Sequence, residues 1–258
     1  MSLLDIPTVI LCEVLANWLE IEELGMLDSA LCERHSRGTF LQAIGHSRFL
    51  CMGNPSSKID DYHLLWLFKR KVHLQSLCVS DPDVNFLPSD CQVFHRLDYL
   101  DIYYRNRLQL IMDACASNLK VIILRGCETM FVDALAAALG CSQLHTLDIA
   151  EFTKFIDRKK LKGTQENSLF SADKIACKNT LRNVICNWPN LSLRHLHILL
   201  STCSNITRLE LNITALNDET IYSIVASCPN LTTLKLIRCG CTTTDGIAAI
   251  ANLTNLQS

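Results

Sequence analysis

Two pairs of side chains in this sequence have the residue types of metal ligands. They are the H-x-H pair of His195 and His197 and the C-x-C pair of Cys239 and Cys241. A zinc site needs four ligands that converge tetrahedrally, and the chain has no C-x-x-C pair to complete such a set. It also has no glycine-rich phosphate loop and no G-x-S-x-G nucleophile motif. We therefore predict no metal site, no cofactor and no enzyme activity.

The other feature with possible chemistry is the set of 14 cysteines. In a small secreted protein such a number would suggest a disulfide framework. Here several recur at one place relative to a repeated leucine pattern: Cys141, Cys203 and Cys228 each lie three residues before Leu144, Ile206 and Leu231. A free cysteine acts as a small apolar filler inside a protein. We predict reduced, buried thiols, as in a cytoplasmic protein, with the nucleus as the alternative compartment.

Composition excludes several classes of function. A net charge of −2 gives no general attraction to nucleic acid or to an anionic membrane. No apolar run reaches the roughly 18 residues that a membrane span needs. The first 15 residues lack the basic start and small-residue cleavage site of a secretory signal. We predict a protein whose partners are other proteins, with no nucleic acid and no membrane.

The residues that would position any binding surface lie in a repeat. An apolar anchor is followed by apolar residues at +3 and +5, and the anchors are Leu74, Leu97, Leu119, Leu144, Leu181, Ile206 and Leu231, with Leu256 starting one more. Apolar residues two apart point to one face of a strand. A helical spacing follows in the later repeats, as in Ile221, Ile224 and Val225 after Asp218, and we expect Asp218 and Asp245 to cap these helices.

A period of 20 to 29 residues with L-x-x-L-x-L is the leucine-rich-repeat signature. We predict an α/β fold: a leucine-rich-repeat solenoid over 73–258, with a parallel sheet inside and helices outside. An insertion of about 151–168 lengthens one repeat, and the last repeat is incomplete. Because the sequence stops at the start of a further strand, we predict that it is a fragment of a longer repeat protein.

The first 46 residues have a different, helical pattern. Wide apolar faces recur there, and residues 47–72 read as a linker and a capping helix. The stretch IPTVILCEVLANWLEIEELGMLDSALC resembles the F-box, at Ile6-Pro7, Ile10-Leu11, Val14-Leu15, Glu23-Leu24, Leu27 and Leu31-Cys32. The resemblance implies a small all-α module that docks the adaptor of an SCF-type ubiquitin ligase. The implied adaptor-binding residues are Pro7, Ile10, Leu11, Val14, Leu15 and Leu24. The alternative is a helical cap that only shields the first repeat.

The sheet predicts a second surface. If the residues at +3 and +5 face the core, those at +2, +4 and +6 face solvent. Tyrosine and arginine are favoured interface anchors. The candidate partner-binding residues on this concave face are Tyr99, Asp101, Tyr103, Arg125, Asp148, Arg208, Glu210 and Lys235.

Together these features predict the substrate-recognition subunit of a cullin-RING (SCF-type) ubiquitin ligase. The F-box-like module would bind the adaptor and the repeats would bind a substrate protein. The alternative is a leucine-rich-repeat scaffold for protein–protein interaction with no role in ubiquitin transfer.

Overall fold

The structure is a computed structural model that describes residues 6–31, 34–46, 51–52, 61–79, 94–103, 108–125, 131–149, 171–187, 192–238, 240 and 242–258. The chain forms two compact units, Met1–Asn118 and Leu119–Ser258, and each is described by itself. The predicted boundaries at residues 46 and 72 both lie inside the first unit. The predicted insertion at 151–168 lies outside the described residues.

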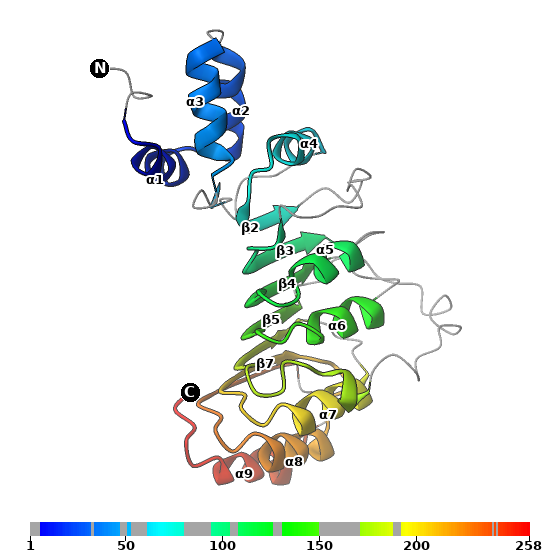
Figure 1. The fold of residues 1–258 in the computed structure, drawn as a ribbon. Coiled ribbons are helices and arrows are strands. Elements are labelled where there is room, and N and C mark those ends of the chain that lie inside the picture. The colour runs from blue at the N-terminus through cyan, green and yellow to red at the C-terminus, as the bar shows by residue number, and fades with distance from the viewer. Residues whose placement is uncertain are drawn as a thin grey trace. The chain divides into compact units, whose positions relative to one another are not determined.

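The first unit joins a group of helices to a short parallel sheet (Figure 1). Its elements are α1 (Thr8–Trp18), α2 (Ile21–Ala30), α3 (Arg34–Ile44), β1 (Cys51–Met52), α4 (Asp61–Arg70), β2 (Leu74–Val79), β3 (Tyr99–Tyr103) and α5 (Leu108–Cys115). Strand β2 pairs in parallel with both β1 and β3. The sequence pattern did not predict β1, because two residues are too few to show alternation.

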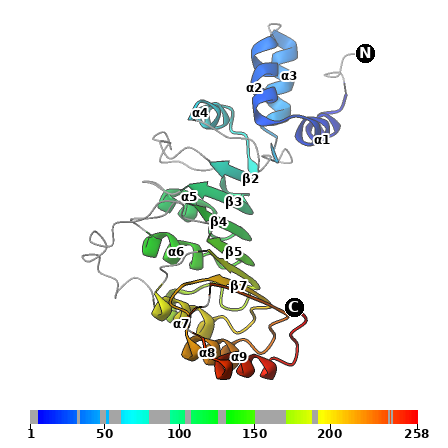
Figure 2. The same ribbon diagram turned by 180° about the vertical axis from the view of Figure 1, so that it is seen from behind.

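The second unit alternates strands with helical segments. In order these are β4 (Val121–Arg125), α6 (Phe131–Leu139), β5 (Thr146–Ile149), η3 (Ala172–Lys174), β6 (Asn183–Cys186), α7 (Leu193–Thr202), β7 (Arg208–Asn212), α8 (Asp218–Ser227), β8 (Thr233–Ile237), α9 (Thr244–Ala249) and η4 (Ile250–Asn252). Each strand from β4 to β8 pairs in parallel with the next one along the chain. In both views the helices α6 to α9 follow one another on the same side of the strands (Figures 1 and 2). The predicted parallel α/β class is confirmed.

The strand cores have the predicted alternation. In β4, β5 and β6 every second residue is buried. The seven predicted anchors are all fully buried, at 0% exposure: Leu74, Leu97, Leu119, Leu144, Leu181, Ile206 and Leu231. The 25-residue spacing appears directly in the strand register, where Leu209 lies beside Leu234 and Leu211 beside Leu236. Packing of equivalent residues from neighbouring strands therefore builds the core of this unit.

The helix caps differ from the prediction by one or two residues. Helix α8 is capped by Asn217, whose side chain accepts a 3.0 Å hydrogen bond from the Thr220 amide, and α9 is capped by Thr243. The predicted caps Asp218 and Asp245 instead lie inside the first turns of α8 and α9. Asp218 accepts hydrogen bonds from the Thr243 amide (2.8 Å) and hydroxyl (2.6 Å). A carboxylate of one helix thus fixes the start of the next.

Turn residues before the anchors also join neighbouring repeats. The Asn205 side-chain amide donates to the Asn179 carbonyl (3.2 Å), and that of Asn255 donates to the Pro229 carbonyl (3.0 Å). Thr180 donates its hydroxyl in the same way, to the Ser142 carbonyl (3.0 Å). None of the helices in the described part of the chain has the length and apolar character needed to cross a membrane.

Candidate protein-binding surfaces

The histidine pair does not form a metal clamp. His195 and His197 both lie on α7, and residues two apart on a helix do not face each other. His195 is buried, at 7% exposure. Cys239 and Cys241 lie outside the described residues. Within the described residues, no three histidine, cysteine or carboxylate side chains are grouped as metal ligands.

The described cysteines are packed inside the units as free thiols. The side chains of eight are described, all without disulfides, and seven of them are buried. Cys177 and Cys203 are hydrogen-bonded to each other, and this bond together with burial raises the pKa of Cys177. Burial, with the nearby Cys203, raises the pKa of Cys228 to about 12. A thiol with a raised pKa is a poor nucleophile at neutral pH, so these residues fit a filling role.

Helix α1 has a buried side, and it exposes apolar side chains near its two ends. Leu11, Cys12 and Leu15 face the core, where the Cys12 thiol donates to the Ala43 carbonyl of α3. Toward the two ends of the helix Ile10 is 51% exposed and Trp18 is 80% exposed. An exposed indole is typical of a surface that binds a partner.

The predicted adaptor-binding set is divided by this arrangement. Pro7 and Ile10 are exposed and Val14 is half-buried. Leu11, Leu15 and Leu24 are at most 1% exposed, so these three belong to the core of the unit rather than to its surface. The physical reason is the wide apolar face of α1, because Leu11 and Leu15 lie on the part of that face that packs inside the unit. We use the name α1 face for the remaining exposed apolar residues of this helix, Val9, Ile10 and Trp18, which lie near its two ends and not on one stripe.

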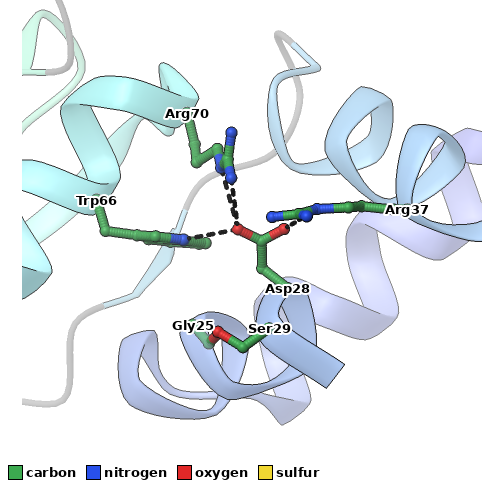
Figure 3. A network of polar contacts seen from close by, with 6 residues as sticks. All are labelled: Gly25, Asp28, Ser29, Arg37, Trp66 and Arg70. Carbon is green, nitrogen blue, oxygen red and sulfur yellow. Dashed lines mark hydrogen bonds and ion pairs between the residues drawn. The ribbon is translucent and has the colours of Figure 1, made fainter. Parts of the chain in front are cut away.

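A buried carboxylate joins α2, α3 and α4 in the same unit. Asp28 of α2, at 3% exposure, accepts hydrogen bonds from three side chains (Figure 3). Arg37 Nε of α3 lies 3.0 Å from Oδ1, and Trp66 Nε1 of α4 lies 3.0 Å from Oδ2. Arg70 of α4 reaches Oδ2 through Nη2 at 2.9 Å and Nε at 3.0 Å. One side chain therefore ties α2 to both α3 and α4.

Opposing effects set the charge state of Asp28. Burial raises the pKa of this carboxyl, but the hydrogen bonds from Trp66, Arg37 and Arg70 outweigh it and hold the pKa below its usual value. The ionised form, with its three donors, is thus the form that the fold stabilises. A buried carboxylate without such donors would strongly destabilise the fold.

The predicted sheet-face residues of the second unit meet on β7 and β8. Arg208 binds Glu210 through Nη2 and through Nε at 2.8 Å. Lys235 Nζ lies 3.6 Å from the other Glu210 oxygen. The hydrogen bond from Arg208 lowers the pKa of Glu210 more than burial raises it, and the net shift is downward. We define Arg208, Glu210 and Lys235 as the charged cluster.

The remaining sheet-face candidates are not grouped in this way. Asp148 and Arg125 are half-buried on β5 and β4. Tyr99 is half-buried on β3, in the other unit, and Tyr103 ends that strand. Asp101 was predicted to face solvent, but it is 3% exposed and makes a polar interaction. Alternation along a strand sets the direction of a side chain but not whether neighbours cover it.

Sequence reasoning missed the Asp28 network. One signal was present, because Asp28 lies four residues after Leu24 on the apolar stripe of α2, and a charge on a buried stripe needs partners. Its partners could not be identified, since Trp66 and Arg70 lie 38 and 42 residues away along the chain.

No family model matches the sequence, and no curated protein matches it. One match among solved structures is a B12-independent methionine synthase from Shewanella sp. W3-18-1, in complex with selenomethionine. The two share 11% identity, and the match covers 77% of this chain and 65% of the synthase, just under two thirds of its length. Its TM-score of 0.28 is too low to support any argument about fold or activity.

Proposed function

We propose that this chain is a bridging subunit that binds one protein through the α1 face and a second through the sheet of its strand–helix repeats. By its resemblance to F-box/leucine-rich-repeat proteins, the first partner is an SCF-type adaptor and the second is a substrate for ubiquitin transfer. The chain itself does no chemistry; it holds the substrate near the ligase and raises its local concentration.

One observation carries the proposal: α1 exposes Ile10 and Trp18, although Leu11, Cys12 and Leu15 of the same helix are buried. Trp18, at 80% exposure, is a large apolar side chain that the unit itself leaves uncovered. Docking of a partner helix would remove this area from water, which is worth about 25 cal/mol per Å² of apolar surface. Tryptophan is also among the residue types most often found at the energetic centre of an interface.

The leucine-rich-repeat interpretation of the second unit is supported by its register. Strands β7 and β8 align Arg208 with Thr233 and Asn212 with Ile237, one full 25-residue period apart. In a stack of this kind each repeat depends on its neighbours, and the sheet presents one side chain per repeat at each position of a strand. Such a column suits recognition of an extended protein segment.

The second candidate function is a scaffold that binds proteins without any role in ubiquitin transfer. The burial of Leu11, Leu15 and Leu24 favours it, because half of the adaptor-binding set implied by the resemblance is already used in the core. A helical cap that shields the first repeat would bury the same three residues.

The test is co-purification of the full chain with an SCF-type adaptor. A double variant, Ile10→Asp with Trp18→Ala, is expected to weaken binding by about 30-fold or more, since hot-spot truncations cost about 2 kcal/mol or more. Tyr222→Ala is the matched control, an exposed aromatic on α8. If the wild-type chain, correctly folded, does not bind the adaptor, the ligase function is refuted and the scaffold remains.

A further inference from the structure

The charged cluster on β7 and β8 has more positive than negative charge at its surface. Arg208 and Lys235 have side chains that are 52% and 60% exposed, whereas the side chain of Glu210 between them is only 14% exposed. The two cations thus face solvent and the anion lies beneath them. The three side chains together carry one net positive charge.

Glu210 holds the two cations without using all their donors. An arginine has five N–H donors and a lysine has three. Arg208 uses two of its nitrogens on one carboxylate oxygen. Lys235 approaches the other oxygen at 3.6 Å, too long for a good hydrogen bond. The cluster therefore positions one guanidinium and one ammonium group whose remaining protons are available to a partner.

Neighbouring positions on the sheet supply further polar groups. The register places Arg208 between Asn183 of β6 and Thr233 of β8. Adjacent strands are about 4.8 Å apart, so these side chains lie within reach of one bound segment. Asp148 lies in the same row as Glu210 but two strands away, with Ile185 between them. The exposed cations Arg208 and Lys235 therefore make β7 and β8 the strands to which an anionic ligand is attracted.

We propose that this part of the sheet binds an acidic segment of a partner protein, with its carboxylates placed between Arg208 and Lys235. The inference rests on the proposed use of the sheet as a protein-binding surface, and it adds the chemistry of the ligand. Nucleic acid is the less suitable ligand, because phosphate chains are bound by long stripes of cations and this cluster has two cations and one anion.

Glu210 gives the proposal a sharp test. It competes with the ligand for the same two cations, so Glu210→Gln should free them and tighten binding. The probe is a fluorescein-labelled peptide of three glutamates in a glycine–serine frame, and its counterpart has three glutamines. Binding to the full chain is measured by fluorescence anisotropy at low ionic strength, where exposed charges are least screened.

The wild-type chain is expected to prefer the glutamate peptide, and Glu210→Gln is expected to tighten its binding by up to about fivefold, the range of one exposed ion pair. Arg208→Ala with Lys235→Ala should abolish the preference. Lys178→Ala, which removes an exposed cation elsewhere in this unit, should leave it unchanged.

Besides a failure of Glu210→Gln to tighten binding of the glutamate peptide, three outcomes would overturn the inference. The first is the absence of a preference for glutamate, and the second is a preference that the double variant retains. The third is tighter, cluster-dependent binding of a labelled oligothymidine, which would identify nucleic acid as the ligand. Because Glu210→Gln is expected to gain affinity, its effect cannot arise from misfolding. Capture of the adaptor is scored separately on the α1 face, so either proposal can fail while the other stands.

Discussion

Replacing Asp28 by alanine removes the acceptor that joins three helices of the first unit. Arg37, Trp66 and Arg70 would each lose a hydrogen bond of 2.9 to 3.0 Å. Loss of one member of a buried ion pair costs about 3–5 kcal/mol, mainly because the other member stays buried without a counter-charge. Arg37 and Arg70 have side chains that are 43% and 30% exposed and can turn toward water. We therefore expect the lower end, about 3 kcal/mol.

Hydrogen exchange measured by mass spectrometry locates the effect. A loss of about 3 kcal/mol corresponds to exchange more than a hundredfold faster, since each 1.4 kcal/mol is a factor of ten. The increase should appear in α2, α3 and α4 and be absent from β6 to β8, which belong to the other unit. Glu22→Gln is the control, an exposed carboxylate on the same helix. Unchanged protection of α2 and α4 in Asp28→Ala would refute the reasoning.

The same network gives the first unit a defined pH dependence. The pKa of Asp28 is lower in the folded chain than the ordinary value of 3.8. A lowered folded-state pKa stabilises the fold above the unfolded-state value, and that stabilisation is lost as the pH falls through the folded-state value. In the wild-type chain, the urea concentration at the unfolding midpoint of the first unit should therefore decrease as the pH is lowered below about 4. Asp28→Asn should remove this part of the acid dependence, and an unaltered acid profile would contradict it.

Three further predictions concern the second unit. Leu209→Ala should lower the free energy of unfolding, measured in urea, by about 2–5 kcal/mol. Leu234→Ala should lower it clearly less, because Leu209 is fully buried and Leu234 is only half-buried. Equal losses would contradict burial by neighbouring repeats. Gly246→Ala should lower the melting temperature, since its Cβ would lie 2.1 Å from Asp218 Oδ1, and the added Asp218→Ala should relieve the clash. Cys228, with its pKa raised to about 12 by burial, should resist iodoacetamide at pH 8 until urea unfolds the chain; rapid native labelling would contradict this.

The sequence was sufficient to place the strands because their signal is local and repeated. Each anchor from Leu97 to Leu231 lies two residues before the first residue of its strand. Period-two alternation then orients every side chain of the strand. Helix starts were less certain, since Asn217, Asp218 and Thr243 are all good caps, and only the fold shows which of them is used.

The position of the charged cluster could be predicted in part from the sequence for the same reason. Arg208 and Glu210 are two residues apart on one strand, and Lys235 lies one 25-residue period after Glu210. Periodicity alone brings these three side chains to one place on the sheet. The Asp28 network has no such regularity. Its donors come from α3 and α4, and only the packing of three helices decides that they meet.

Asp101 and Glu210 show the limit of the argument from alternation. Both occupy the fourth position after an anchor, on strands with the same pattern. Asp101 is nevertheless buried, whereas Glu210 is half-buried beside two exposed cations. A period fixes the direction of each side chain, but its exposure depends on the size and conformation of the residues around it. A charged residue on this face of the sheet can therefore meet a partner only where its neighbours leave the charge accessible, as they do for Arg208 and Lys235.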